Sequence, residues 1–199
     1  MTATVLPEPL LDYIRELHSG ADRGYHAWSH PLALLALLPE VEGGLHDPLA
    51  VRCAILLHDA IYEPRRTDNE SRSAELAREI LTGVISPDTL DRTVALIEAT
   101  KAHAIPDDLS EGEAADLAVF LDMDLSILAA SSEAFDAYED GVRHEYHEVP
   151  TDLFRMGRAA ILESFLARDH LYMSPWGLEQ FEGPARSNLR RSITALRAV

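Results

Sequence analysis

The sequence is poor in cysteine and in basic residues. Its single cysteine, Cys53, has no partner for an intramolecular disulfide, and inside an apolar segment it is expected to act as a small hydrophobic residue. The 17 Lys and Arg residues are outnumbered by 34 Asp and Glu residues, so the formal charge is −17. So acidic a chain argues against a nucleic-acid polymer or an anionic membrane as its main partner.

Long apolar runs and an N-terminal targeting signal are also missing. No apolar stretch approaches the roughly 18 residues of a membrane span. The opening residues, MTATVLPEPL, contain neither a basic segment nor an apolar core. Together with the single cysteine, these features predict a soluble cytoplasmic protein.

Helical periodicity is what the sequence does contain. With 47% hydrophobic and 26% charged residues, the 199-residue chain has the composition of a globular protein. Apolar residues recur at helical spacing in nearly every segment, and none alternates with period two for long. We therefore predict one all-α domain over residues 1–199, a bundle of about seven to nine helices. Residues 23–130 would form its core, with helices from 131–199 packed on it. The last of these helices is predicted over 178–196.

The pair His58-Asp59 ends an apolar run. Residues 49–57 are apolar almost all round, which predicts a helix through the centre of the domain, with this pair at its buried end. The helix is expected to start after Asp47, with Pro48 at its first position. An imidazole beside a carboxylate suits zinc, manganese, iron or nickel. A helix-terminal histidine followed by a capping or turn aspartate explains the dipeptide equally well, because Pro64 ends the helix soon after.

Two shorter patterns carry weaker signals. His26 and His30 are four residues apart, so they share a helix face if this turn is helical, although core or capping histidines are more common than zinc ligands. Thr67 and Glu70 have the spacing of a capping box. Asn69 or Glu70 could also reach a site beside His58-Asp59, because the intervening loop is short.

Two aspartates interrupt the apolar segment 113–130. Asp122 and Asp124 are costly there unless something neutralises them, and they lie about 200° apart around a helix, so one ion is unlikely to take both. We favour Asp124 as a ligand and Asp122 as a supporting group. His103, after the preceding helix, is interpreted as a substrate contact or a helix-end residue before a ligand.

His30, His58-Asp59 and Asp124 follow one another in the order H…HD…D. This order resembles the HD-domain superfamily of metal-dependent phosphohydrolases. Further short matches between residues 25 and 189 are similar to a bacterial subgroup known only as predicted HD phosphohydrolases. They are Tyr25-His26-x-x-x-His30, His58-Asp59-Ala60-x-Tyr62-x-Pro64, Asp68-Asn69-Glu70-x-x-Ser73-Ala74, Ala99-Thr100-x-x-His103, Asp122-x-Asp124-Leu125-x-x-Leu128, Glu145-Tyr146, Gly157-Arg158 and Ala185-Arg186-x-Asn188-Leu189.

The resemblance implies an all-α fold with one divalent ion, Mn, Zn, Fe, Ni, Co or Mg, held by His30, His58, Asp59 and Asp124. Asp122 is open as an alternative fourth ligand, and His26 as an alternative first. Superfamily members that bind two ions have further histidines between the HD pair and the last aspartate. This chain has only His103 in that interval, which favours a single ion.

Such an ion would produce hydroxide from its water and neutralise a phosphoryl oxygen. Asp59 and Glu70 are predicted as the catalytic groups that orient or deprotonate that water. Groups predicted to bind the substrate phosphate are Arg23, His26, Lys101 and His103, with Arg158 as a further candidate. The expected function is a phosphomonoesterase or phosphodiesterase of a small phosphorylated molecule, with nucleotides among the candidates.

Two other functions stay open. A non-catalytic, metal-dependent nucleotide-binding or sensing module would use the same site without turnover. Oxidative chemistry at iron is a third class, disfavoured by the scarcity of spare histidines. The substrate, the native metal and the oligomeric state, a homodimer included, are not determined by the sequence.

Overall fold

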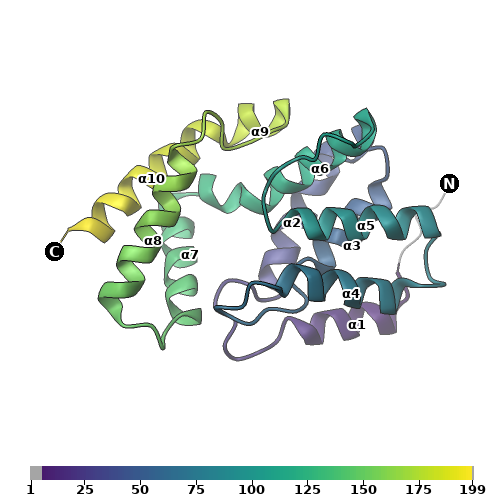
Figure 1. Ribbon diagram of the computed structural model, residues 1–199, viewed down its shortest axis with the longest axis horizontal. Helices are drawn as coiled ribbons and strands as arrows, with labels where there is room; N and C mark the ends of the chain where they lie inside the picture. Colours follow the sequence, from purple (N-terminus) through teal and green to yellow (C-terminus); the bar gives the residue numbers. More distant parts are fainter. Residues whose placement is uncertain (1–5, 199) are drawn as a thin grey trace.

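The computed structural model describes residues 6–198 and is helical throughout (Figure 1). Within these residues there is no β-strand, which confirms the all-α prediction, and the ten α-helices exceed the expected number by one. None of the described helices is both long and apolar enough to cross a membrane. The elements are α1 (Glu8–Leu17), α2 (Ser29–Val41), η1 (Glu42–Gly44), α3 (Pro48–Leu57), α4 (Asn69–Leu81), α5 (Pro87–Ala99), α6 (Glu111–Asp124), η2 (Leu125–Ala129), α7 (Ser132–Glu145), α8 (Thr151–Leu166), α9 (Pro175–Gln180) and α10 (Glu182–Arg197).

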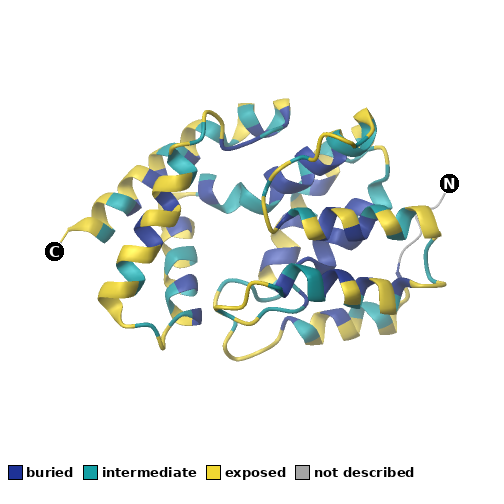
Figure 2. Ribbon diagram, viewed as in Figure 1, coloured by how far each residue is buried: buried dark blue, intermediate teal, exposed yellow. Residues whose placement is uncertain are grey.

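Helix α3 forms the centre of the larger apolar core. It begins as predicted, with Pro48 in its first turn and the Asp47 side chain accepting a hydrogen bond from the Ala50 amide. Seven of its ten residues are buried, and it packs against α2, α4, α5 and α6. Figure 2 shows exposed residues on the outward faces of α4 and α5, which cover it. Burying one such leucine contributes about 1.5–3 kcal/mol.

The buried apolar side chains form two clusters. The larger joins α1 through α6, and the smaller joins η2 with the helices from α7 to α10. Helix α6 and the 3-10 helix η2 are consecutive, so the chain passes directly from the first cluster into the second. In Figure 1, α7, α8 and α10 accordingly lie together at one end of the molecule.

Two local predictions were wrong at helix ends. The capping box of Thr67 and Glu70 does not form, because α4 begins at Asn69 and the Asn69 side chain instead bonds the backbone N–H and C=O of Glu63. The last predicted helix, 178–196, is broken at Phe181. Helix α2 begins at Ser29, so His26 precedes it, and the helical turn on which a shared face of His26 and His30 depended does not form.

Gly24, before α2, and Gly141, in α7, are in close backbone contact. A Cβ atom on Gly24 would lie 2.2 Å from the Gly141 carbonyl oxygen, and one on Gly141 would lie 3.1 Å from the Tyr25 amide nitrogen. Both neighbours are backbone atoms, which cannot rotate away as a side chain can. The contact therefore requires glycine on both sides and brings α7 against the segment that precedes α2.

This contact predicts opposite effects for two alanine substitutions. Gly24→Ala should lower the free energy of unfolding by about 1–3 kcal/mol, because the new methyl group overlaps backbone. The matched Gly157→Ala in α8, where a Cβ meets nothing within 4 Å, should raise it by about 0.5–1 kcal/mol through better helix propensity. Urea denaturation of both variants measures the difference. Equal stabilities would show that α7 does not pack tightly on residue 24.

Candidate metal centre

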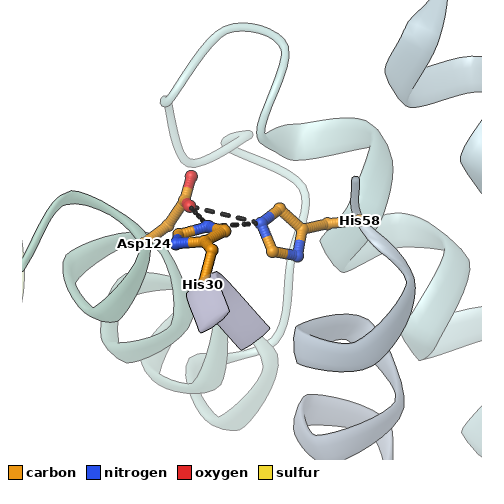
Figure 3. A group of neighbouring side chains, drawn as sticks. All are labelled: His30, His58 and Asp124. Atoms are coloured by element: carbon orange, nitrogen blue, oxygen red, sulfur yellow. Dashed lines mark hydrogen bonds and ion pairs between the residues drawn. The ribbon is translucent and has the colours of Figure 1, made fainter. Parts of the chain in front are cut away.

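Four side chains from three helix ends converge on one point. His30 lies in the first turn of α2, His58 and Asp59 follow the last residue of α3, and Asp124 ends α6. His30 Nε2 is 3.0 Å from His58 Nε2 and 3.1 Å from Asp124 Oδ1. His58 Nε2 is 3.3 Å from the same Asp124 oxygen and 3.1 Å from Asp59 Oδ2. Figure 3 shows His30, His58 and Asp124 pointing toward one another.

These separations are those of ligands around one ion. Neighbouring ligands of an octahedral ion with bonds of about 2.1 Å lie about 3.0 Å apart, and those of a tetrahedral zinc about 3.4 Å apart. His30 Nε2 and Asp59 Oδ2 are 3.7 Å apart, slightly beyond this range. His30, His58 and Asp124 thus form a group that could hold a metal ion, and Asp59 lies beside it.

The hydrogen bonds of His58 indicate why a cation suits this position. Its Nδ1 lies 3.1 Å from the Ile55 carbonyl oxygen, which can only accept, so Nδ1 carries the proton. Its Nε2 then faces the oxygens of Asp59 and Asp124. Burial opposes a charge on His58, but these two carboxylates outweigh it and raise the pKa of His58 well above its usual value, so Nε2 holds a proton where a metal ion would otherwise bind. Acceptors at such distances repel one another unless a proton or a metal ion lies between them. A backbone bond on the far ring nitrogen is also the usual way in which a metal-binding histidine is oriented.

The charge balance favours the ligand forms of both carboxylates. Burial opposes ionisation of Asp124, but the charge of His58 and the hydrogen bond from His103 outweigh it, so the pKa of Asp124 lies well below its usual value. The pKa of Asp59 is lowered for the same reason, with His58 again the main opposing charge to burial. Burial lowers the pKa of His30, which favours its neutral imidazole.

His103 supports Asp124 from the other side. Its Nε2 lies 3.0 Å from Asp124 Oδ2, the oxygen that does not face His30 and His58. It follows the end of α5 in a left-handed conformation with φ of 45°, which is uncommon for a residue with a side chain. His103 therefore orients the Asp124 carboxylate. The sequence did not indicate this role, and contact of His103 with a substrate stays a prediction.

The Arg23 guanidinium donates its hydrogen bonds to backbone carbonyl groups. Its Nη1 donates to the carbonyl oxygens of His26 (2.6 Å) and Asp59 (2.8 Å), and its Nη2 donates to that of Ala60 (2.9 Å). The guanidinium thus joins the loop before α2 to the loop after α3. Phosphate binding by Arg23 stays a prediction, and the contacts observed are those of a positioning residue.

Glu145, at the end of α7, was not predicted as a site residue. Its buried carboxylate accepts hydrogen bonds from the amides of Tyr25 (2.7 Å) and His26 (2.8 Å), from His26 Nδ1 (2.8 Å) and from the Tyr62 hydroxyl (3.0 Å). Burial opposes its charge, but these donors lower the pKa of Glu145 below its usual value. The only signal for Glu145 in the sequence was its place in the matched pair Glu145-Tyr146. Its neighbours in the helix are polar, so it reads as an ordinary surface residue.

His26 is held in one orientation by this carboxylate. Its ring stacks on Tyr62, with centroids 4.0 Å apart. Burial opposes its charge, but Asp59 and Glu145 outweigh burial and raise the pKa of His26. With Nδ1 bonded to Glu145, its Nε2 has no hydrogen-bond partner among residues 6–198. His26 therefore offers one ring nitrogen beside the cluster, and His30 occupies the ligand position for which His26 was the alternative.

Asp122 lies away from the cluster, and its interpretation as a group that supports a metal ligand was wrong. Its carboxylate accepts hydrogen bonds from the Met173 amide (2.8 Å), the Ser174 amide (2.8 Å) and the Ser174 hydroxyl (2.6 Å). Burial raises the pKa of Asp122 despite these bonds. The aspartate neither supplies a ligand nor supports one. It joins α6 to the segment before α9.

The remaining predicted groups are placed less specifically. Glu70 is partly buried in the first turn of α4, and Lys101 is exposed after α5. Neither side chain makes a hydrogen bond or ion pair within the described part of the chain, and their roles stay predictions. Arg158 is buried and bonds Glu139 and the Tyr138 hydroxyl, so its guanidinium is already paired.

Comparison of the chain with protein-family models, curated proteins and solved structures gave no match. The likeness to the HD-domain superfamily therefore stays a prediction from the sequence motifs. The grouping of His30, His58 and Asp124 is an observation of this structure and does not depend on that likeness.

The two aspartates of α6 predict opposite results on substitution. Asp124→Asn should remove about one bound divalent ion per chain and leave the fold intact, because a ligand charge is lost. Asp122→Asn should keep the ion but cost about 1–3 kcal/mol of stability, because an amide group would face backbone N–H donors. Metal analysis by mass spectrometry and thermal unfolding measure both. Metal loss in Asp122→Asn alone would reverse the assignment.

Glu145→Gln should reduce stability in a pH-dependent way. A histidine whose folded-state pKa is raised stabilises the fold fully below its unfolded pKa, and that contribution is lost as the pH rises through the folded value. The stability difference between wild type and Glu145→Gln should therefore be largest near about pH 5.5 and shrink toward about pH 9. Urea titrations at both pH values measure it. A pH-independent difference would mean that Glu145 does not stabilise the charged form of His26.

Proposed function

We propose that this protein is a metal-dependent phosphoric ester hydrolase that acts on a small phosphorylated molecule. The observation that carries the proposal is the convergence of His30, His58 and Asp124 on one point, with Asp59 Oδ2 3.1 Å from His58 Nε2 and 3.7 Å from His30 Nε2. The H…HD…D order, typical of metal-dependent phosphohydrolases in the resemblance described above, agrees with this geometry.

The donor set suits a hard or borderline divalent ion. Two imidazoles and two carboxylates fill four positions and leave others open on an ion that takes five or six ligands. When bound, such an ion supplies Lewis-acid polarisation of a phosphoryl oxygen and lowers the pKa of a coordinated water. The residues of the chain must then position the ester and move two protons.

His26 is suited to donate the proton that the leaving group needs. Its Nδ1 is bonded to Glu145, so Nε2 is the nitrogen that can face a substrate, and the side chain is 22% exposed. Asp59 and Glu145 raise the pKa of His26 against the effect of burial, which keeps the imidazolium available near neutral pH. His26, first considered as a substrate-binding group, thus becomes the proposed general acid, and Glu145 is its positioning residue.

Asp59 and Glu70 are the proposed acceptors for the proton of the attacking water. Asp59 lies within the cluster, with its oxygen 3.1 Å from His58 Nε2. Glu70 is on the first turn of α4, which follows the HD pair after a short loop. Arg23 positions both segments through its bonds to the carbonyls of His26 and Asp59. Lys101 is kept as the proposed phosphate-binding cation.

Activity of the metal-loaded protein tests the proposal. Wild type, supplied in turn with manganese, zinc, iron, nickel, cobalt and magnesium, should release phosphate or alcohol from members of a broad panel of phosphate esters. His26→Gln should lower kcat by about 10²–10⁴-fold and retain the metal. His170→Gln, an exposed histidine in the loop before α9, is the matched control and should keep full activity.

Three outcomes would contradict hydrolysis. A folded, metal-loaded protein that cleaves no ester in the panel rejects the proposal. Tight binding of intact nucleotides without turnover would instead support the sensing module. Oxygen consumption by the iron-loaded protein would support oxidative chemistry.

A further inference from the structure

A groove of about 550 Å³ lies beside the metal centre, between α2 on one side and η2 and α7 on the other. We call it the α2–α7 groove. Its walls come from the two leucines that follow His30 along one side of α2 and from small or aliphatic residues opposite. They are Leu34, Leu37, Ile127, Ala130, Ala134 and Ala137. Its volume is within the usual 300–1,000 Å³ of small-molecule sites.

The lining of the α2–α7 groove carries no formal charge. Charged residues make up 26% of the chain, yet among the described residues no Asp, Glu, Lys or Arg lines this groove. A second cavity of about 330 Å³, near α5 and α6, is lined by Asp88, Asp91, Arg92 and Glu113 and gives the contrast. A ligand with several charges would lose hydration in the α2–α7 groove and gain no ion pair there.

The groove adjoins the metal centre at two residues. His30, a proposed metal ligand, and Tyr25 belong to its wall, whereas His26, His58, Asp59 and Asp124 do not. The Tyr25 ring lies 4.8 Å from the His30 ring, 4.9 Å from the His26 ring and 4.5 Å from that of Tyr138, which is also in the wall. The groove therefore meets the centre at His30, and Tyr25 links its wall to the proposed general acid His26.

We propose that the α2–α7 groove binds the leaving group of the substrate and that this group is apolar, an alkyl or aryl alcohol esterified to a single phosphate. This inference rests on the proposed function and narrows its substrate class. It disfavours nucleoside polyphosphates, because the groove offers no cation to their additional phosphates. The net charge of −17 on the chain would also repel them.

The reaction is a balanced hydrolysis. The oxygen of water forms a new bond to phosphorus while the bond from phosphorus to the alkyl or aryl oxygen breaks. That oxygen takes a proton from His26 and leaves as the alcohol, and the proton of the water passes to Asp59 or Glu70. The imidazole is reprotonated from solvent, and phosphate is released, so no oxidant or reductant is needed.

A homologous series of esters tests the groove directly. In wild type, kcat/KM should rise from methyl through butyl to hexyl phosphate, by up to about fourfold for each methylene that becomes buried. Ala137→Phe fills the groove from an exposed position of α7, so it should abolish this rise and lower kcat/KM far more for hexyl phosphate than for methyl phosphate. Ala160→Phe, at an exposed position of α8 outside the groove, is the matched control and should preserve the rise.

Binding of phosphonates separates this inference from the proposed function, because they cannot be hydrolysed. Calorimetry on the metal-loaded protein should show hexylphosphonate binding more tightly than methylphosphonate, and Ala137→Phe should remove the difference. If no ester is cleaved but this binding pattern is observed, the proposed hydrolase activity is rejected and the groove is supported as the binding site of an apolar group. If esters are cleaved with no dependence on chain length, or Ala137→Phe affects methyl and hexyl compounds equally, the groove inference is overturned and the hydrolase stands.

Discussion

The burial of mutually dependent polar groups is the constraint on which the rest of this structure depends. His58 Nε2 and the oxygens of Asp59 and Asp124 face one another inside a largely apolar core, at distances that are stable only with a proton or a metal ion between them. Three helix ends supply these groups, so α2, α3 and α6 must be held in register. The apolar packing of α3 against its neighbours supplies the stabilising free energy.

A second set of contacts organises the region around the cluster. Arg23 joins the loops that carry His26 and Asp59, and Glu145 joins the loop before α2 to Tyr62. Because Glu145 belongs to α7, the smaller apolar cluster contributes directly to the site that the larger one forms. The close contact of Gly24 with Gly141 brings α7 near enough for this. The C-terminal helices thus orient the His26 imidazole and form one wall of the adjacent groove.

Local sequence patterns succeeded where the interaction that determines structure is itself local. The start of α3 followed from Asp47 and Pro48, and the burial of that helix followed from its continuous apolar composition. The same kind of reasoning failed for Thr67 and Glu70, because the Asn69 side chain binds the backbone of Glu63 and moves the start of α4. It also missed Glu145, whose partners lie about 120 and 83 residues away in the chain.

The sequence by itself determined the helical class, the central apolar helix and a short list of metal-binding residue types, since periodicity, composition and adjacent residues are properties of the chain alone. Only the tertiary structure decided between Asp122 and Asp124. Both are acids in one apolar helix, and helical spacing favoured Asp124 as the ligand but left Asp122 open as the alternative. Helical geometry points them in different directions, and the segment that packs on each side differs: the backbone of Met173 and Ser174 for Asp122, and three histidines for Asp124.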